Sequence, residues 1–329
     1  MRTSIILLRF GVALLGVGFA KAGYVLEDTF DSQNFFNEFD FFADKDPTEG
    51  FVKYSNAATA NISSLAGYVN NAVFLGVDHT TVNPPQGRSS VRVSSKKAYT
   101  HALIIADIEH MPDSQCGAWP AFWTLGQDPW PSNGEIDILE GVNDDQTNHI
   151  TLHTSPGCNI ESTGAMSSST LSTPNCNAGN AGDGCSLKTT NKQGYGTGFN
   201  AAGGGVYAME WTSSAIKVFF FTRSSIPADI TSGNPDPKTW GAPVGSFSGG
   251  GCSIDSHFKS HQIIFNTSLC GKWAGAVWKD GSCAALAPTC EAYVAANPQA
   301  FEQAYWMINS VKVYQPNMAA GKREVPFLG

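Results

Sequence analysis

Residues 134–141 read Gly-Glu-Ile-Asp-Ile-Leu-Glu-Gly, a short apolar run that carries three acids and has a glycine at each end. Alternation of polar and β-branched residues with a period of two is typical of a strand with one buried face. Acidic side chains are depleted in strands and costly to bury, so three on one apolar strand need a functional reason. The segment therefore predicts both a strand and a cluster of carboxylates.

Similar β-branched and aromatic runs recur along the chain between turn-forming residues, at 90–94, 102–108, 149–154, 206–211, 215–221, 261–266 and 305–314. The best helix candidate is 289–296, which ends before Asn297-Pro298. Many short strands without alternating helices predict an all-β sandwich. The Gly-, Asn- and Ser-rich segment 175–205 is expected to be a surface loop of that sandwich and not a linker.

The composition excludes several classes of protein. Hydrophobic residues make up 42% of the 329 residues and aromatic residues 11%, enough buried surface to offset the chain entropy of folding. The net charge of −8 repels a phosphate backbone, so a nucleic-acid binder is not expected. Only 15% of residues are charged, against roughly 25% in an average soluble protein. A neutral or cationic partner is favoured.

The two ends of the chain differ from the rest. An apolar run at 5–20 follows Arg2 and closes on Ala20-Lys21-Ala22, the small-x-small form of a signal-peptidase site. The run is shorter than the roughly 20 residues that span a bilayer, so 1–22 predict a secretory signal and no membrane anchor. We expect a secreted, extracellular protein with one catalytic sandwich domain at 23–317. The tail at 318–329 has no periodicity.

All eight cysteines follow the predicted signal, and their number is even. In a secreted chain this predicts disulfides that hold loops, and no spacing resembles a zinc site. The pairing stays open. Two Asn-x-Ser/Thr sequons, at Asn61 and Asn266, predict glycosylation sites on the same secretory route.

The spacing of the three acids implies a particular geometry. In a regular strand Glu135 and Asp137 share a face, whereas Glu140 lies on the other. A β-bulge at 138–139 would return Glu140 to the first face, about 13 Å from Glu135 at ~3.3 Å per residue. Side chains leaning over Asp137 would bring the two carboxyls to the roughly 5–5.5 Å of retaining glycosidases. Solvent-facing acids and a calcium site are the alternatives.

These residues resemble glycoside hydrolase family 16, and within it the secreted fungal endo-β-1,3(4)-glucanases, or laminarinases. The resemblance rests on 134–141, on Gly-Ala-Trp-Pro-Ala-Phe-Trp at 117–123, on Thr-Leu-His-Thr at 151–154 and on Asn-Thr-Ser-Leu-Cys-Gly-Lys-Trp-Ala-Gly at 266–275. It extends to the last strand at 306–314. It implies a concanavalin A-like β-jelly-roll sandwich, with a sugar cleft on its concave sheet, and retention of anomeric configuration. Lys272 is a departure, since relatives often carry an acid before the tryptophan.

The resemblance also implies roles for the acids: Glu135 is the nucleophile, Glu140 the acid/base, and Asp137 assists Glu135. The expected substrate-binding residues are Trp123 and Trp273 as sugar platforms, with Trp119, Trp130 and His153 as further candidates that could equally be structural. His153 is expected to face Glu140 across the sheet. Arg88 and Arg92 could meet sugar or acids, or form surface salt bridges, and Trp211 and Trp306 are expected in the core.

The resulting hypothesis is a monomeric, retaining endo-β-1,3(4)-glucanase that hydrolyses laminarin-type β-1,3-glucan, with mixed-linkage glucan left open as a substrate. A non-catalytic β-glucan-binding lectin and a cell-wall glucan transglycosylase are the alternatives. No cofactor or catalytic metal is expected, although a structural calcium ion stays open. The predicted partner is the polysaccharide.

Overall fold

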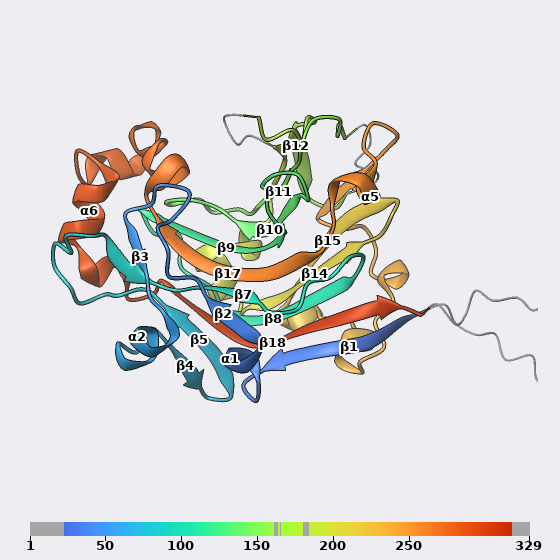
Figure 1. The fold of residues 1–329 in the computed structure, drawn as a ribbon, viewed down its shortest axis with the longest axis horizontal. Coiled ribbons are helices and arrows are strands. Elements are labelled where there is room, and N and C mark those ends of the chain that lie inside the picture. The colour runs from blue at the N-terminus through green and yellow to red at the C-terminus, as the bar shows by residue number, and fades with distance from the viewer. Residues whose placement is uncertain (1–22, 161–163, 165, 180–183, 318–329) are drawn as a thin grey trace, which may run out of the picture.

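The computed structural model describes residues 23–160, 164, 166–179 and 184–317. The predicted signal at 1–22 and the tail at 318–329 lie outside these residues. Two large antiparallel sheets pack face to face and form the body of the structure (Figure 1). We call the sheet that contains residues 135–140 the acid-bearing sheet, and the other the opposite sheet. The predicted all-β sandwich is confirmed.

The acid-bearing sheet has the strand order β12 (Ser169–Thr173), β13 (Cys185–Thr189), β11 (His149–His153), β10 (Glu135–Glu140), β9 (Ala118–Gly126), β17 (His261–Leu269), β7 (Arg92–Ser95), β2 (Phe39–Phe41). The opposite sheet has the order β16 (Gly245–Ser248), β15 (Ala215–Thr222), β14 (Gly205–Trp211), β8 (Leu103–His110), β18 (Tyr305–Pro316), β5 (Ala72–Gly76), β4 (Ala66–Val69). Outside these orders, β1 (Tyr24–Asp31) pairs with β18, and β3 (Val52–Tyr54) pairs in parallel with β6 (Arg88–Ser90).

The helices are short and lie in the connections between strands: α1 (Phe35–Glu38), α2 (Ala57–Ile62), α3 (Gly196–Ala201), α4 (Ala228–Thr231), α5 (Ile254–His257) and α6 (Cys290–Ala296). Single 3-10 turns add η1 (Lys192–Gly194), η2 (Arg223–Ser225), η3 (Pro237–Thr239), η5 (Trp278–Asp280), η6 (Ser282–Ala285) and η7 (Pro298–Phe301), with a π turn at η4 (Gly271–Gly275). The predicted helix at 289–296 is confirmed as α6, whose first turn is capped by the Thr289 hydroxyl. No helix in the described residues is long and apolar enough to cross a membrane.

The core lies between the two sheets because alternate residues of each strand point inward. Ile136 and Ile138 on β10 are fully buried there, and the rings of Phe122 and Phe265 stack at 4.5 Å on the neighbouring strands. Trp306 is 1% exposed and packs edge-on against Phe265, so its predicted place in the core is confirmed. The faces of the acid-bearing sheet are thereby fixed: one is packed, and the other is concave and turned away from the core (Figure 1).

Two expectations about strands and loops were wrong. The segment 175–205 is not only a loop, because β13 extends the acid-bearing sheet beyond β11 and α3 follows it. The run at 90–94 is broken at Val91, so β6 leaves for a separate pairing with β3 while β7 joins the main sheet. Strand pairing is a long-range interaction that local patterns do not report.

Four disulfides confirm the predicted stapling: Cys116–Cys283, Cys158–Cys252, Cys176–Cys185 and Cys270–Cys290. Two of them fasten the helical segment after β17, which includes α6, to the ends of β9 and β17. Closing long loops in the unfolded chain is one source of disulfide stabilisation. This segment rises beside one end of the concave face (Figure 1).

Candidate active site

The predicted bulge is present on β10. Asp137 pairs with Trp123 on β9, whereas Leu139 pairs with Phe122 and Glu140 with Ala121, so one extra residue lies on β10. The register with β11 shifts in the same interval. As a result Glu135, Asp137 and Glu140 share the concave face, and Ile136, Ile138 and Leu139 are fully buried on the other.

Asn148, just before β11, holds the bulge from the side. Its Oδ1 accepts a hydrogen bond from the Glu140 backbone N–H at 2.7 Å, and its Nδ2 donates to the Ile138 carbonyl at 2.8 Å. The Asn148 side chain is fully buried, and its own N–H donates to the Thr189 hydroxyl on β13. A bulge interrupts the regular hydrogen bonding between strands. Asn148 satisfies two backbone groups at this interruption, the Glu140 N–H and the Ile138 carbonyl. Asn148 was not among the predicted site residues, because an asparagine in a turn has no distinctive local signal.

Each glutamate accepts a hydrogen bond from a tryptophan. Trp130 Nε1 donates to Glu135 Oε2 at 2.7 Å, and Trp119 Nε1 donates to Glu140 Oε1 at 2.7 Å. Trp130 is 44% exposed, although apolar side chains of this size are usually more buried. Both tryptophans therefore touch the acids directly, and the alternative of plain core packing is excluded for them.

Asp137 and His153 form an ion pair between the glutamates. Asp137 Oδ2 lies 3.2 Å from His153 Nε2, and the Asp137 side chain is 2% exposed. The expectation that His153 faces Glu140 was wrong, because its register partner is Glu135. Beyond the bulge, the residue of β11 that pairs with Glu140 is His149. His149 was missed, although its spacing of four from His153 places both on one strand face.

The electrostatics of the cluster favour protonated glutamates. Burial and the nearby Asp137 carboxylate raise the pKa of Glu135 to about 7 and that of Glu140 well above its usual range. Burial alone would lower the pKa of His153, but contact with Asp137 and the field of the two glutamates raise it to about 9. Near pH 7 the imidazolium therefore offsets part of the negative charge.

Trp123 lies on the same face as the acids, with its indole N–H donating to Asn266 Oδ1 at 2.7 Å. The Arg92 guanidinium lies 4.9 Å from the Trp123 ring centroid, a cation–π contact. Trp123 is only 8% exposed and packs with Ala121 and Ile264. Its role as a sugar platform stays a prediction.

Two expectations from the sequence fail because the side chains are buried. Asn266 is 7% exposed, and its Nδ2 donates to the Tyr54 hydroxyl at 3.2 Å, so this amide is not placed to carry a glycan. Arg88 is fully buried, donates to the Val294 carbonyl at 3.1 Å and pairs with Asp78 at 3.4 Å. It holds α6 and does not form a surface salt bridge or meet the acids.

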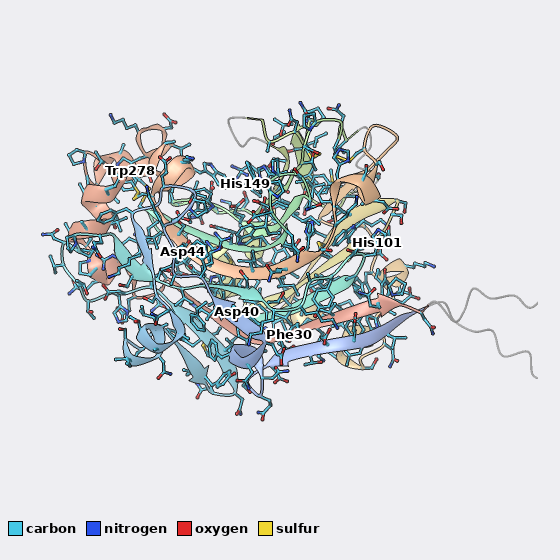
Figure 2. The ribbon with its side chains drawn as sticks, viewed as in Figure 1. Phe30, Asp40, Asp44, His101, His149 and Trp278 are labelled. Atoms are coloured by element: carbon cyan, nitrogen blue, oxygen red, sulfur yellow. A yellow bond between two sulfur atoms is a disulfide. The ribbon has the colours of Figure 1, made fainter. Side chains whose placement is uncertain are left out.

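A pocket of about 280 Å³ adjoins the Glu140 end of the site, because one of its lining residues, His149, pairs with Glu140. Its lining includes His149, Trp273, Trp278 and Lys188, and His149 and Trp278 are labelled in Figure 2. The Trp273 ring packs edge-on against both Trp119 at 5.7 Å and His149 at 5.3 Å. Trp273 thus lies beside the acids, as its predicted role requires, but contact with sugar stays a prediction.

Glu135, Asp137 and His153 offer ligand atoms within 4.8 Å of one another. Calcium takes six to eight oxygen ligands, whereas this group supplies two carboxylates and an imidazole that is already paired with Asp137. The donor set therefore does not fit the calcium alternative at the acids.

A curved sandwich with two carboxyls, an imidazole and indoles on its concave face has the features of a glycoside hydrolase. The comparisons with known proteins agree. Residues 39–314 match the family model described as an XgeA-like, catalytic GH16 domain, and the chain belongs to glycoside hydrolase family 16.

The chain is similar to the endo-1,3(4)-β-glucanase of Arthroderma benhamiae, with 48% identity over 98% of this chain and 70% of that protein. It is 45% identical to a probable endo-1,3(4)-β-glucanase of Aspergillus niger over 92% of this chain, but spans only 41% of that relative. The structure of laminarinase 16A from Phanerochaete chrysosporium, with β-glucans in donor and acceptor sites, is 42% identical, with a TM-score of 0.84 over 89% of this chain and all of that one. An elongating family 16 β-1,3-glucosyltransferase is 44% identical, with a TM-score of 0.82 over the same shares.

The two hydrogen bonds from the Asn148 side chain to the bulge, which we call the clamp, give the first prediction. Asn148→Ala leaves the Glu140 N–H and the Ile138 carbonyl without partners, which should cost about 1–3 kcal/mol of unfolding free energy for each group left buried. Displacement of Glu140 should also lower kcat/KM, since a shift of about 1 Å can cost roughly 10²-fold. Urea unfolding and glucan hydrolysis measure the two effects. Gln146→Ala, at an exposed site in the same turn, is the control; equal activity of both variants would contradict the clamp.

The raised pKa of Glu135 gives the second prediction. Folding raises the pKa of this carboxyl from its ordinary 4.5 to about 7, so the folded state holds the proton more tightly than the unfolded chain. The free energy of unfolding therefore falls as pH rises between these two values. Glu135→Gln carries no charge, so its Tm should exceed that of the wild type by a margin that grows from pH 4.5 to 7 and is constant above. Thermal unfolding by circular dichroism across that range measures the margin. A margin that shrinks with rising pH would show that the ionised Glu135 is stabilised in the fold.

Proposed function

We propose that this chain is a retaining endo-β-1,3(4)-glucanase that hydrolyses laminarin-type β-1,3-glucan through a covalent glycosyl-enzyme. The proposal depends on one observation: the bulge places Glu135 and Glu140 on one face, each with an indole donor at 2.7 Å. The curated relatives described above are named as endo-1,3(4)-β-glucanases or probable ones, which supports the glucan substrate. The chain spans 70% of the first of these relatives and 41% of the second.

In the first step one Glu135 oxygen attacks the anomeric carbon while the bond to the leaving oxygen breaks. Glu135 Oε2 already accepts from Trp130, which leaves Oε1 for the attack. Near pH 7 Glu135 is partly ionised, and His153 with its positive charge stabilises that form. Asp137 fixes the His153 ring through their ion pair and assists Glu135 in this way.

Glu140 supplies the proton to the leaving oxygen. It is 9% exposed, and burial together with the nearby Asp137 carboxylate raises its pKa well above the usual range, which favours the protonated form that this role requires. Since Glu140 Oε1 accepts from Trp119, the proton is carried on Oε2. In the second step Glu140 takes a proton from water, the water oxygen bonds to the anomeric carbon, and the Glu135 ester bond breaks. Neither step needs a cofactor, because the two carboxyls and water balance every proton and bond.

The pocket lined by Trp273 and His149 lies at the Glu140 end, where the leaving sugar departs or an acceptor sugar could bind. That pocket keeps glucan transfer as the second candidate, together with the 44% identity to an elongating glucosyltransferase. Both activities share the glycosyl-enzyme and differ only in whether water or a sugar hydroxyl attacks it. A lectin that only binds glucan would not need two carboxyls held on one face, so this alternative does not account for the Glu135 and Glu140 pair.

The assigned roles predict different outcomes for the two glutamates. Glu135→Gln should abolish turnover of every substrate, since no nucleophile remains. Glu140→Gln should lose about 10²–10⁴-fold in kcat/KM on laminarin but far less in kcat/KM on a dinitrophenyl glucoside oligomer. This parameter reports the first step, in which that leaving group needs no proton. Steady-state kinetics on both substrates make the comparison, and wild-type folding is checked by circular dichroism. Equal losses on both substrates for Glu140→Gln would reject its role as the acid.

The products separate hydrolysis from transfer. Purified protein incubated with laminarin, lichenan or cellulose should shorten laminarin, and proton NMR should show the β-anomer of the new reducing end first. Chains longer than the starting oligosaccharide at low conversion would make transfer the main activity. An α-anomer formed first would reject retention, and no reaction with any of the three would favour the lectin.

A further inference from the structure

A second groove, of about 950 Å³, lies on the opposite sheet and faces away from the core. Tyr68 on β4, Phe74 on β5, and Tyr305 and Met307 on β18 line it. Trp306, between the last two, points into the core, so the groove residues occupy the outer face of this sheet. The groove and the three acids therefore lie on opposite sides of the sandwich.

The groove has an aromatic floor. The Tyr305 ring stacks on His110 at 3.9 Å with an interplanar angle of 6°, and Phe74 contacts Tyr305 at 5.4 Å. Polar groups of Asn70 and Glu109 are in the lining too. Flat rings match the C–H faces of sugars, and a few polar groups suffice to bind their hydroxyls. The chemistry of this groove is that of a carbohydrate site.

Asn61, the first residue of the sequon Asn61-Ile62-Ser63, is itself part of the groove lining. Its side chain is exposed near the end of α2, and within the described part of the chain its amide makes no hydrogen bond. Asn266 is the matched contrast, since its amide is buried between Trp123 and Tyr54. Only Asn61 is thus placed to accept a glycan.

Apolar side chains gather around this sequon. Ile62 is 83% exposed, Tyr68 45% and Val69 43%, and they account for three of the eight large hydrophobic side chains exposed in the described residues. Exposed apolar groups that cluster usually mark a covered surface.

We propose that an N-linked glycan on Asn61 folds back into this groove and that its core sugars cover the Tyr305 and Tyr68 rings. The four disulfides fit the oxidising secretory route on which such a glycan is added. A tether at the groove rim gives the sugar a millimolar effective concentration, so even a weak, open site is filled. This inference does not depend on the glucanase activity.

The first test uses the full chain secreted from a fungal host. Mass spectrometry of glycopeptides should find Asn61 occupied and Asn266 bare. An endoglycosidase that cuts within the glycan core should act more slowly on native than on denatured protein. Tyr305→Ala, or Tyr68→Ala if the former folds poorly, should abolish that protection, whereas the control Val82→Ala, at an exposed site outside the groove lining, should keep it. A bare Asn61, or equal cleavage of native and denatured protein, would overturn the proposal.

The second test measures stability. Asn61→Gln and Ser63→Ala remove the same sequon through different side chains, and both should lower Tm by the same few degrees. Tyr305→Ala should lower Tm less in the Asn61→Gln background than in the glycosylated protein, because sugar and ring act together. Full additivity would reject the contact. The inactive Glu135→Gln protein tests whether the groove binds external glucan instead. If it binds laminarin, and if adding Tyr305→Ala abolishes that binding with or without a glycan on Asn61, the groove is a site for external glucan and the proposal is overturned.

Discussion

One extra residue on β10 governs the chemistry of this protein. Without the bulge at 138–139, the period of two would turn the Glu140 side chain into the core, where an unpaired carboxyl is costly. With it, Glu135 and Glu140 face the same concave surface, and three apolar side chains still fill the core. The buried amide of Asn148 satisfies the backbone groups that this irregularity exposes. The bulge and its clamp therefore form one unit, on which the geometry of both carboxyls depends.

The same unit carries an electrostatic cost. Three acids lie on one strand face, and burial raises the pKa of both glutamates. Protonated His153 forms an ion pair with Asp137 and so offsets one negative charge. The indole N–H groups of Trp119 and Trp130 donate hydrogen bonds to the two glutamates. Functional sites commonly keep such perturbed groups at the expense of stability. Burial favours the protonated form of Glu140, which suits the role of acid that we propose for it.

Much of the architecture could be predicted from local pattern. The runs that became β8, β10, β14 and β18 alternate strongly, and the Thr289 cap marks the start of α6. The N-terminal strands and β13 were missed, since their sequences are short, polar or irregular and gain their stability from neighbours. The turn at Asn70-Asn71, with positive φ at both residues, marks the hairpin of β4 and β5 and could have been found from its type I′ chemistry. Burial explains the failed expectations for Asn266 and Arg88.

By itself the sequence determined the sandwich class, the presence of disulfides, the three acids and their need for a bulge, because these follow from side-chain period and residue chemistry. Only the tertiary structure decided which histidine meets which acid, that Trp119 and Trp130 bind the glutamates, how the cysteines pair, and which sequon is open. These depend on strand register and on contacts between residues far apart in the chain, such as Trp123 with Asn266. A shift of one residue in register changes every such partner, and nothing local in the sequence fixes that register.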